Sequence, residues 1–387
     1  MSTSGKNKSR KFIKSIQRVN GGQTLKIIFH GEEMDQSFVN SLRRTLMSEI
    51  KTYSLMAQQS VLSNTSQVFK NNEMLINRIG QIPIYIKDLD KATFLQEKLI
   101  FYICEPDEPD KPLVNNNDTD LEITSYSFQI YDTEGNLTKY KIEDLVPYDL
   151  PILKLRKGEE FHYKCEMAEG VGYYHANWKG CRVAMKYENE ISLKSDHSKS
   201  KKSIITGLPL ETLDNKRNYP KEQNGDPKFI SLSITSVGHY EPELCFKLAL
   251  ETLEEKLLIL RNLVENPRML LSTQINIIHN VNIDNYIEIK IQDMEETQQF
   301  LATETLGNLL RRHMFFKLEK ETKGDLSKLS KCLINYKRPH PLDRILVLVI
   351  QIAPGIWNKS DIPAIQLFYE TTDNLIGYIK QLKKDFS

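Results

Sequence analysis

The sequence of 387 residues has little cysteine and no cysteine pair with the CxxC spacing of many zinc sites. It has no apolar run close to the roughly 18 residues of a membrane span, and its basic N-terminus is not followed by the apolar segment of a secretory signal. These absences argue against a membrane-spanning protein and a disulfide-rich secreted domain. Free thiols in a reducing compartment are expected at Cys104, Cys165, Cys181, Cys245 and Cys332.

The sequence also lacks an excess of charge of one sign, because 52 basic residues are balanced by 51 acidic ones. The whole molecule is therefore not drawn to nucleic acid by its charge, and any such contact has to be local. Residues 1–20 are locally basic, and we interpret them either as a solvated tail or as an arm that binds phosphate or a partner. The basic residues of this segment are Lys6, Lys8, Arg10, Lys11, Lys14 and Arg18.

What the sequence does contain is one short pattern that occurs twice. Residues 40–46 read NSLRRTL, and residues 308–314 read NLLRRHM. Around each copy, apolar residues recur with helical spacing and the paired arginines fall on another face. A single repeat at such a distance indicates two related modules rather than a solenoid, whose period is about 20–50 residues. The apolar rows are Phe38, Leu42, Leu46 and Ile50 in the first copy, and Leu306, Leu310 and Met314 in the second.

Hydrophobic periodicity elsewhere predicts strands and long amphipathic helices. Helices are expected at residues 34–50, 241–264, 303–317 and 363–386. Strands are expected at residues 23–30, 229–236, 286–291, 333–336 and 344–352. Thr303 or Thr305 is the expected N-cap of the third helix, and the polar segment 318–331 is interpreted as an exposed loop.

Between residues 52 and 225 the composition changes to short strand-like runs separated by turn-rich loops. The expected strands are 75–86, 99–104, 122–131 and 160–167, and the loops include 105–119 and 194–203. We interpret this part as a mostly β domain inserted into a strand-helix module that resumes after it. The expected organisation is a basic tail (1–20), a first module (21–51 and 226–266), an insertion (52–225), a linker (267–284) and a second module (285–387).

No set of residues makes a convincing catalytic site. Gly170 and Gly172 begin like a GxGxxG phosphate-binding fingerprint, but His175 stands at the third glycine position and no βαβ pattern surrounds it. His340 lies between two prolines, which favours a backbone bend over an acid-base role.

Histidines and cysteines of the insertion are a possible zinc set, and a hydrolase or metal enzyme built on them is one alternative function. Two of them, His162 and Cys165, fall on opposite faces of an expected strand, whereas tetrahedral zinc needs converging ligands. Packing and surface roles are therefore favoured for this set. Its members are His162, Cys165, His175 and Cys181.

The two arginine pairs are the best candidates for a binding site. Guanidinium groups form planar, bidentate pairs with carboxylates and phosphates, which suits protein interfaces and phosphate sites alike. A solvated helix face is the alternative for either pair alone, but the recurrence of the pattern favours an interface. The motif residues are Asn40, Arg43 and Arg44 in the first copy, and Asn308, Arg311 and Arg312 in the second.

These motifs resemble those of a known family. The stretches NSLRRTLMSEI (40–50), LINRIGQIPI (75–84), KLRKGE (154–159) and GVGYYHANW (170–178) are similar to signatures of the third-largest subunit of eukaryotic RNA polymerase II, the archaeal D subunit and the bacterial α-subunit N-terminal domain. TLGNLLR (305–311) and YKRPHPL (336–342) resemble the eleventh subunit or archaeal L. The resemblance covers most of residues 21–387.

The resemblance implies an α+β architecture. Two RNA polymerase α-subunit-type dimerisation modules, with helices packed on antiparallel sheets, would be fused in one chain, and the apolar rows would form the internal dimer core. The implied role is a non-catalytic platform that docks the second-largest and largest polymerase subunits, beside counterparts of the small tenth and twelfth subunits. No cofactor, membrane contact or sequence-specific nucleic acid contact is expected, and the first copy's arginines are expected to face the second-largest subunit.

The fusion of two subunits resembles the polymerases of large nucleocytoplasmic DNA viruses, so we expect an intracellular protein of the virion and the host cytoplasm or nucleus. Two departures from the family pattern stand out. Val39 replaces a frequent glycine that Gly307 keeps, and Cys104 alone remains where many third subunits carry a zinc-binding cluster, so no metal is expected. The alternative function is nucleic-acid binding through the basic N-terminal segment.

Overall fold

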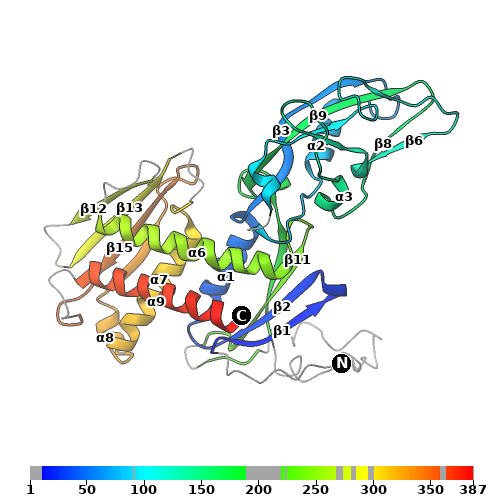
Figure 1. Ribbon diagram of the computed structural model, residues 1–387. Helices are drawn as coiled ribbons and strands as arrows, with labels where there is room; N and C mark the ends of the chain where they lie inside the picture. Colours follow the sequence, from blue (N-terminus) through cyan, green and yellow to red (C-terminus); the bar gives the residue numbers. More distant parts are fainter. Residues whose placement is uncertain are drawn as a thin grey trace, which may run out of the picture.

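The computed structural model shows an α+β fold of antiparallel sheets and long helices, which confirms the expected fold class. Four long helices pack against two four-stranded sheets, and a further group of strands stands to one side of them (Figure 1). The structure describes residues 11–89, 92–188, 219–222, 225–266, 273–279, 285–294, 300–357 and 363–386.

The first sheet combines strands from distant parts of the sequence, in the order β1-β2-β11-β10. Alternate residues of β2, Leu25, Ile27 and Phe29, are at most 1% exposed, as the period of two in a strand requires when one face is covered. The strands are β1 (Ile13–Val19), β2 (Thr24–His30), β10 (Cys181–Tyr187) and β11 (Phe229–Ser236).

The second sheet has the order β12-β13-β15-β14. Alternate residues of β13 are buried, namely Ile287, Ile289 and Ile291, whereas the central strand β15 is apolar on both faces. The strands are β12 (Thr273–His279), β13 (Tyr286–Asp293), β14 (Leu333–Lys337) and β15 (Ile345–Gln351).

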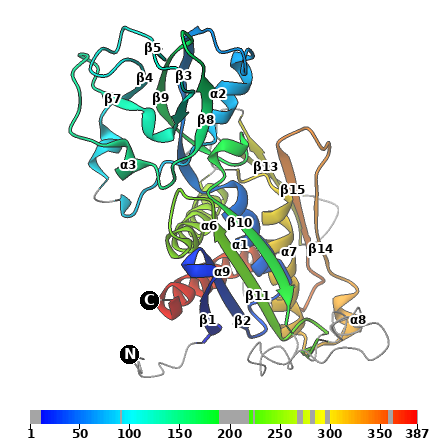
Figure 2. The same ribbon diagram turned by 90° about the vertical axis from the view of Figure 1, so that its right-hand side faces the viewer.

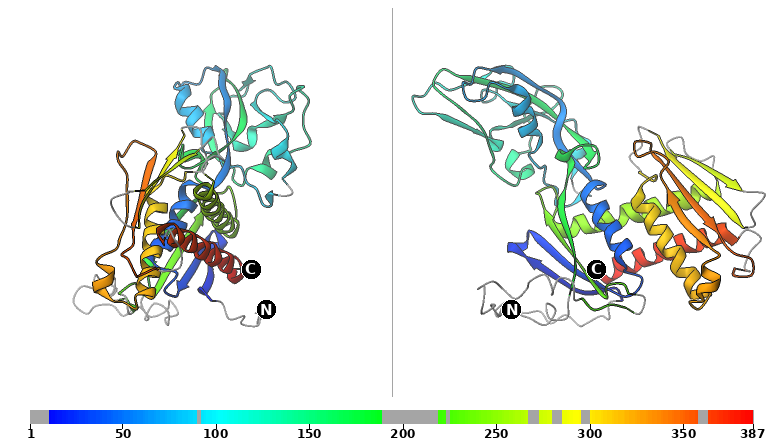
Figure 3. Two further views of the ribbon diagram at one scale, coloured as in Figure 1. Left: turned by 90° about the vertical axis from the view of Figure 1, so that its left-hand side faces the viewer. Right: turned by 180° about the vertical axis from the view of Figure 1, so that it is seen from behind.

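Each sheet is covered by two long helices, and the helices of the two pairs contact each other. Helices α1 and α6 lie on the first sheet and α7 and α9 on the second, while α1 touches α7 and α6 runs beside α9 (Figures 2 and 3). Their apolar faces join in one continuous core. The helices are α1 (Gln36–Ser48), α6 (Pro242–Glu265), α7 (Glu304–Glu321) and α9 (Pro363–Phe386).

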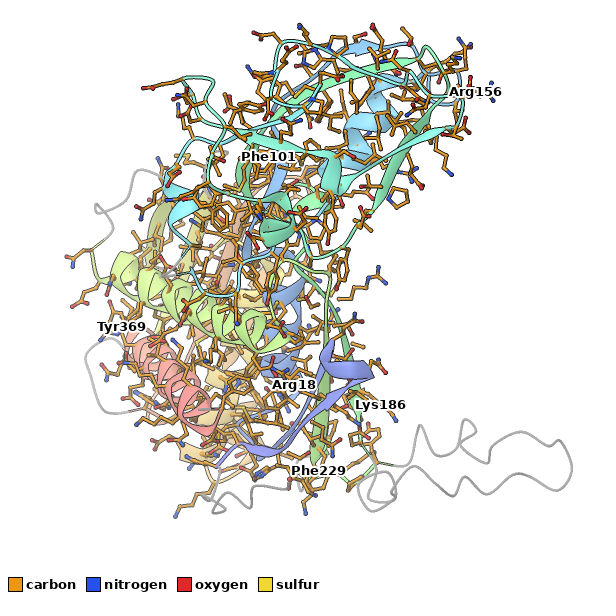
Figure 4. All side chains as sticks on the ribbon, turned by 45° about the vertical axis from the view of Figure 1, so that its right-hand side comes forward. Arg18, Phe101, Arg156, Lys186, Phe229 and Tyr369 are labelled. Carbon is orange, nitrogen blue, oxygen red and sulfur yellow. The ribbon has the colours of Figure 1, made fainter. Side chains whose placement is uncertain are left out.

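The inserted domain is built on two long antiparallel strands, β3 (Lys51–Asn64) and β9 (Glu160–Val171). Phe101 lies within this domain, and Arg156 marks its far end, away from the long helices (Figure 4). Two short helices, α2 (Asn72–Gly80) and α3 (Ile142–Leu145), accompany the strands. The remaining strands are β4 (Ile100–Ile103), β5 (Leu113–Val114), β6 (Leu121–Thr124), β7 (Gln129–Tyr131) and β8 (Pro151–Leu155).

Two predictions from local sequence were wrong. The expected tail does not extend to residue 20, because residues 13–19 form β1 and because Phe12 and Ile13, each 1% exposed, anchor the chain. The expected strand at 75–86 begins as helix α2, since Leu75 and Ile79 lie one helical turn apart in the core and the Asn71 side chain caps the helix by accepting from Glu73 N at 2.9 Å.

The expected domain limits also differ from the structure. Strand β10 belongs to the first sheet, so the insertion ends before Cys181 rather than at residue 225. The expected linker 267–284 contains β12, whose Ile275 is 3% exposed and pairs with Ile291 of β13. The predicted loop 194–203 lies outside the described residues.

The segment 318–331 is not the exposed loop that its polar composition predicted. Helix α7 continues to Glu321, and the short helix α8 (Leu326–Leu329) follows. Leu318 is fully buried and Leu329 is 7% exposed. Leu318 and Leu329 belong to the hydrophobic core, and the polar composition of the segment did not reveal them.

Candidate functional site

The two copies of the arginine motif occupy the same position along two capped helices. The Asp35 carboxylate accepts a hydrogen bond from Phe38 N at 2.9 Å and begins α1, and the Thr303 hydroxyl accepts from Leu306 N at 3.3 Å and begins α7. The motif asparagine is the fifth residue after the cap in both helices. The repetition seen in the sequence is therefore a repetition of helix geometry.

The residues of both apolar rows belong to the continuous core, and α1 contacts α7. Across this contact, the rings of Phe38 and His313 are 6.2 Å apart in an edge-on arrangement. None of the row residues is more than 3% exposed. They are Phe38, Leu42, Leu46, Ile50, Leu306, Leu310 and Met314.

In both copies the asparagine orients the first arginine. Arg43 Nε donates to Asn40 Oδ1 at 3.0 Å, and Arg311 Nη2 donates to Asn308 Oδ1 at 3.2 Å. All four side chains are half-buried. Because the hydrogen bonds span one helical turn, each guanidinium is held along the helix surface with part of its donor set still available.

The second arginine of the motif is used differently in the two copies. Arg312 lies between the two halves of the chain: its Nη2 is 2.5 Å from Asp226 Oδ2, its Nε is 3.7 Å from Asp35 Oδ2, and its guanidinium lies over the Phe316 ring at 4.1 Å. Arg44 is exposed, and its side chain forms no ion pair with any residue in the described part of the chain. Of the four motif arginines, Arg44 alone is exposed.

Asp35 links α1 to α7, and the sequence reasoning missed it. Burial alone raises the pKa of this carboxyl, but the nearby His313, the Phe38 N–H and the Ser37 hydroxyl together hold its pKa below the ordinary value. It therefore stays ionised, with His313 Nε2 at 3.4 Å and Arg312 nearby. The position of Asp35 as a helix N-cap could have been recognised in the sequence, whereas no sequence pattern indicated Asp226.

The glycines of the GVG stretch serve close packing. A Cβ on Gly170 would lie 2.2 Å from the Trp178 ring, and a Cβ on Gly172 would lie 2.9 Å from the backbone oxygen of Met47. These contacts explain both glycines without a bound phosphate.

The histidines and cysteines considered for zinc are used otherwise. His162 Nε2 lies 2.8 Å from the Pro109 carbonyl oxygen, and Cys165 is fully buried. His340 Nδ1 accepts a hydrogen bond from Leu342 N at 3.2 Å, as in a backbone bend. Within the described ranges, no three His, Cys, Asp or Glu side chains converge as metal ligands, and no helix is both long and apolar enough to cross a bilayer.

Comparison with known proteins identifies a family model that matches more than half of this chain. The family model of the RNA polymerase Rpb3/Rpb11 dimerisation domain matches residues 29–257, which run from β2 to the middle of α6 and include the whole of the insertion. The match ends before the second sheet begins.

Individual relatives show the same similarity. The chain is 27% identical over 207 residues to the "Conjugation stage-specific protein" of Tetrahymena thermophila, covering 49% of this chain and 66% of that protein. It is 29% identical over 150 residues to DNA-directed RNA polymerase subunit Rpo3 of Methanocaldococcus jannaschii (39% and 63%), and 27% identical over 237 residues to Rpo3 of Pyrobaculum neutrophilum (57% and 84%). The chain thus spans just under two thirds of the length of the first two.

Proposed function

The chain belongs to the family of the RNA polymerase Rpb3/Rpb11 dimerisation domain, and we propose that it is a non-catalytic assembly subunit of a multisubunit DNA-directed RNA polymerase. In this role it acts as a platform that other polymerase subunits bind. The catalytic magnesium would belong to the largest subunit. Relatives named as polymerase subunit Rpo3 support this proposal.

We further propose that the chain contains both halves of the dimer that the family name describes. The carrying observation is that α1 and α7 contact each other and share the same cap, asparagine and arginine positions. Each helix also has a second long helix and a four-stranded sheet as partners. A chain of this kind would need no separate Rpb11-like subunit, an arrangement similar to the fused subunits of large DNA viruses. A viral source, with virion and host cytoplasm as its locations, belongs to this proposal.

The face of α1 that carries Asn40, Arg43 and Arg44 is the proposed docking surface for the second-largest subunit. Arg44 supports this choice because it is exposed and unpaired among the described residues, whereas Arg312 is engaged inside the molecule. An exposed arginine fork suits a partner carboxylate. The largest subunit and counterparts of the tenth and twelfth subunits would bind other parts of the platform.

Co-expression with the polymerase subunits of the same organism tests the proposal. Arg44→Glu is expected to weaken capture of the second-largest subunit by roughly tenfold or more, as loss of an interface arginine does. Arg156→Glu is the control, since Arg156 is an exposed arginine at the far end of the insertion, away from the long helices (Figure 4). Equal capture by Arg44→Glu and wild type would rule out Arg44, and failure of the wild-type chain to bind any polymerase subunit would overturn the function.

The alternative, nucleic-acid binding through the N-terminal segment, has less support. Lys14 lies over the Phe229 ring at 3.8 Å and Arg18 pairs with Glu243, so these cations are already engaged. Figure 4 shows that both Arg18 and Phe229 belong to the first sheet. Salt-dependent DNA binding by the isolated chain, lost on deletion of residues 1–20, would favour the alternative.

A further inference from the structure

Two adjacent tyrosines are exposed in the turn that follows β9. Tyr173 is 48% exposed and Tyr174 is 43% exposed. Their rings are 5.7 Å apart and nearly perpendicular, at 87°. Paired aromatic rings left open to water in a folded protein are typical of binding surfaces, where tyrosine supplies a large contact area with little loss of side-chain freedom.

The turn is held rigidly against the C-terminal end of α1. Tyr173 N donates to the Ser48 carbonyl at 2.7 Å, and Gly172 packs directly on Met47. Behind the turn, the Trp178 indole N–H donates to the Ala168 carbonyl at 3.1 Å, with its ring on Gly170. The two exposed rings are therefore preorganised, which lowers the entropy cost of binding.

The second half of the chain completes this aromatic surface. The ring of Phe300 lies 4.4 Å from Tyr173 and 5.3 Å from Tyr174, and the Arg344 guanidinium lies 5.9 Å from the Tyr174 ring. Phe300 has a φ of 41°, which is unfavourable for a bulky side chain and is held here by a hydrogen bond from Lys256 Nζ to its carbonyl at 3.1 Å. Backbone strain is thus stored where the ring supports the two tyrosines.

The aromatic surface continues the cationic face of α1. Met47 follows Arg43 and Arg44 at helical spacing, so it lies on the same face of the helix, and its Sδ accepts from Arg43 Nη1 at 3.4 Å. The backbone of Met47 in turn touches the tyrosine turn. Arg44 lies one helical turn before Ser48, whose carbonyl accepts the hydrogen bond from Tyr173 N.

We propose that Tyr173 and Tyr174 are the apolar anchor of the docking surface, and that they bind a segment of the second-largest polymerase subunit that combines an apolar side chain with a carboxylate. The apolar side chain would pack on the two rings, and the carboxylate would pair with Arg44. This chemistry follows from the surface itself, which offers aromatic area beside an unpaired guanidinium. The inference rests on the proposed function.

The test uses the full chain co-expressed with the second-largest subunit. A Tyr173→Ser, Tyr174→Ser double variant is expected to reduce affinity about tenfold or more while its thermal midpoint stays at the wild-type value. The double Tyr→Phe variant keeps the rings and is expected to keep affinity. Tyr148→Ala is the matched control, because Tyr148 is 42% exposed and lies in the insertion, between α3 and β8.

Each other outcome overturns the inference in a recognisable way. Unchanged affinity of the serine variant would show that the rings are not used, although the wild-type chain still binds. A loss of affinity that merely follows a fall in thermal midpoint would show that the rings only join the two halves. Concentration-dependent self-association of wild type, lost in the serine variant, would assign the surface to a second copy. If the wild-type chain binds no polymerase subunit, the proposed function itself fails.

Discussion

Lys256 and Glu49 form an ion pair inside the protein, with Lys256 Nζ 2.6 Å from Glu49 Oε2 and the two side chains only 7% and 8% exposed. The ammonium group also donates to the Phe300 carbonyl, and the Thr45 hydroxyl donates to Glu49 at 3.1 Å. The pair therefore joins α1, α6 and the segment that leads into α7. A charge at this point is acceptable only while all of its partners are present.

Removing one member of this ion pair is expected to destabilise the folded protein. Glu49→Ala leaves the Lys256 ammonium buried with one carbonyl oxygen as its partner, and we expect the free energy of unfolding to fall by about 3–5 kcal/mol. Changing both Glu49 and Lys256 to Met should recover much of this loss, because no unpaired charge remains. Chemical denaturation measures the effect. The control is Lys157→Ala, which breaks the exposed pair with Asp118 and should leave the midpoint unchanged.

The equivalent arginines Arg44 and Arg312 should differ in their effect on stability. Arg312→Ala removes one partner of Asp226 and one of the buried Asp35, and a loss of about 1.5–3 kcal/mol is expected for hydrogen bonds to charged groups. Arg44→Ala removes no intramolecular ion pair that the structure describes, so a change within about 0.5 kcal/mol is expected. Both are the same substitution at the same helix position, so helix propensity cancels. Equal losses in urea denaturation would contradict this assignment.

Gly307 and Gly377 both lie within long helices but differ in the space around them. A Cβ on Gly307 would lie 2.9 Å from Tyr336 Cγ and 3.1 Å from Leu346 Cδ1, so Gly307→Ala should destabilise the protein by about 1–3 kcal/mol through overpacking. Gly377 lies within α9 with open space around its Cα, and Gly377→Ala should stabilise by about 0.5–1 kcal/mol. Thermal unfolding midpoints should therefore move in opposite directions, and a common direction would refute the packing argument.

The elements that could be predicted from sequence are those with a long and regular pattern. Helices α6 and α9 each carry an apolar face over several turns, and β15 is a continuous apolar run, so each was expected within a few residues of its observed limits. In β1 the exposed Lys14 and Arg18 interrupt the apolar pattern that would have indicated a strand. The anchoring residue Phe12 precedes the strand. Short elements that depend on one or two buried side chains gave no such signal.

The candidate site also has a part that local sequence predicted and a part that depends on long-range contacts. The arginine motif was visible because it recurs, and its apolar rows follow from helical spacing. What could not be predicted is the difference between Arg44 and Arg312, because it depends on Asp226, which reaches α7 from a distant segment. The contact of Tyr173 with Phe300 is equally long-range. Helical periodicity describes which face a residue occupies, but not which distant chain segment meets that face.

His239 joins the inserted domain to the first sheet. It follows β11 and is 2% exposed, and its carbonyl accepts a hydrogen bond from Ile86 N of the insertion at 2.8 Å. Burial lowers the pKa of this imidazole to about 4, from an ordinary value of 6.5, although hydrogen bonds to backbone groups, including that of Tyr53, oppose the shift. The folded protein therefore holds His239 neutral at pH 7.

This lowered pKa predicts a loss of stability at mildly acidic pH. Between pH 6.5 and about pH 4 the unfolded chain binds a proton at His239 that the folded chain does not, so the free energy of unfolding falls as the pH is lowered through this window. Above pH 6.5 neither state is protonated there and no loss occurs. From pH 7.5 to pH 5.0 the contribution amounts to about 2 kcal/mol. Urea denaturation of wild type and His239→Gln at both pH values isolates it, because the carboxylates common to both proteins cancel. The wild type should lose more stability than the variant, and parallel losses in the two proteins would show that folding does not lower the pKa of His239.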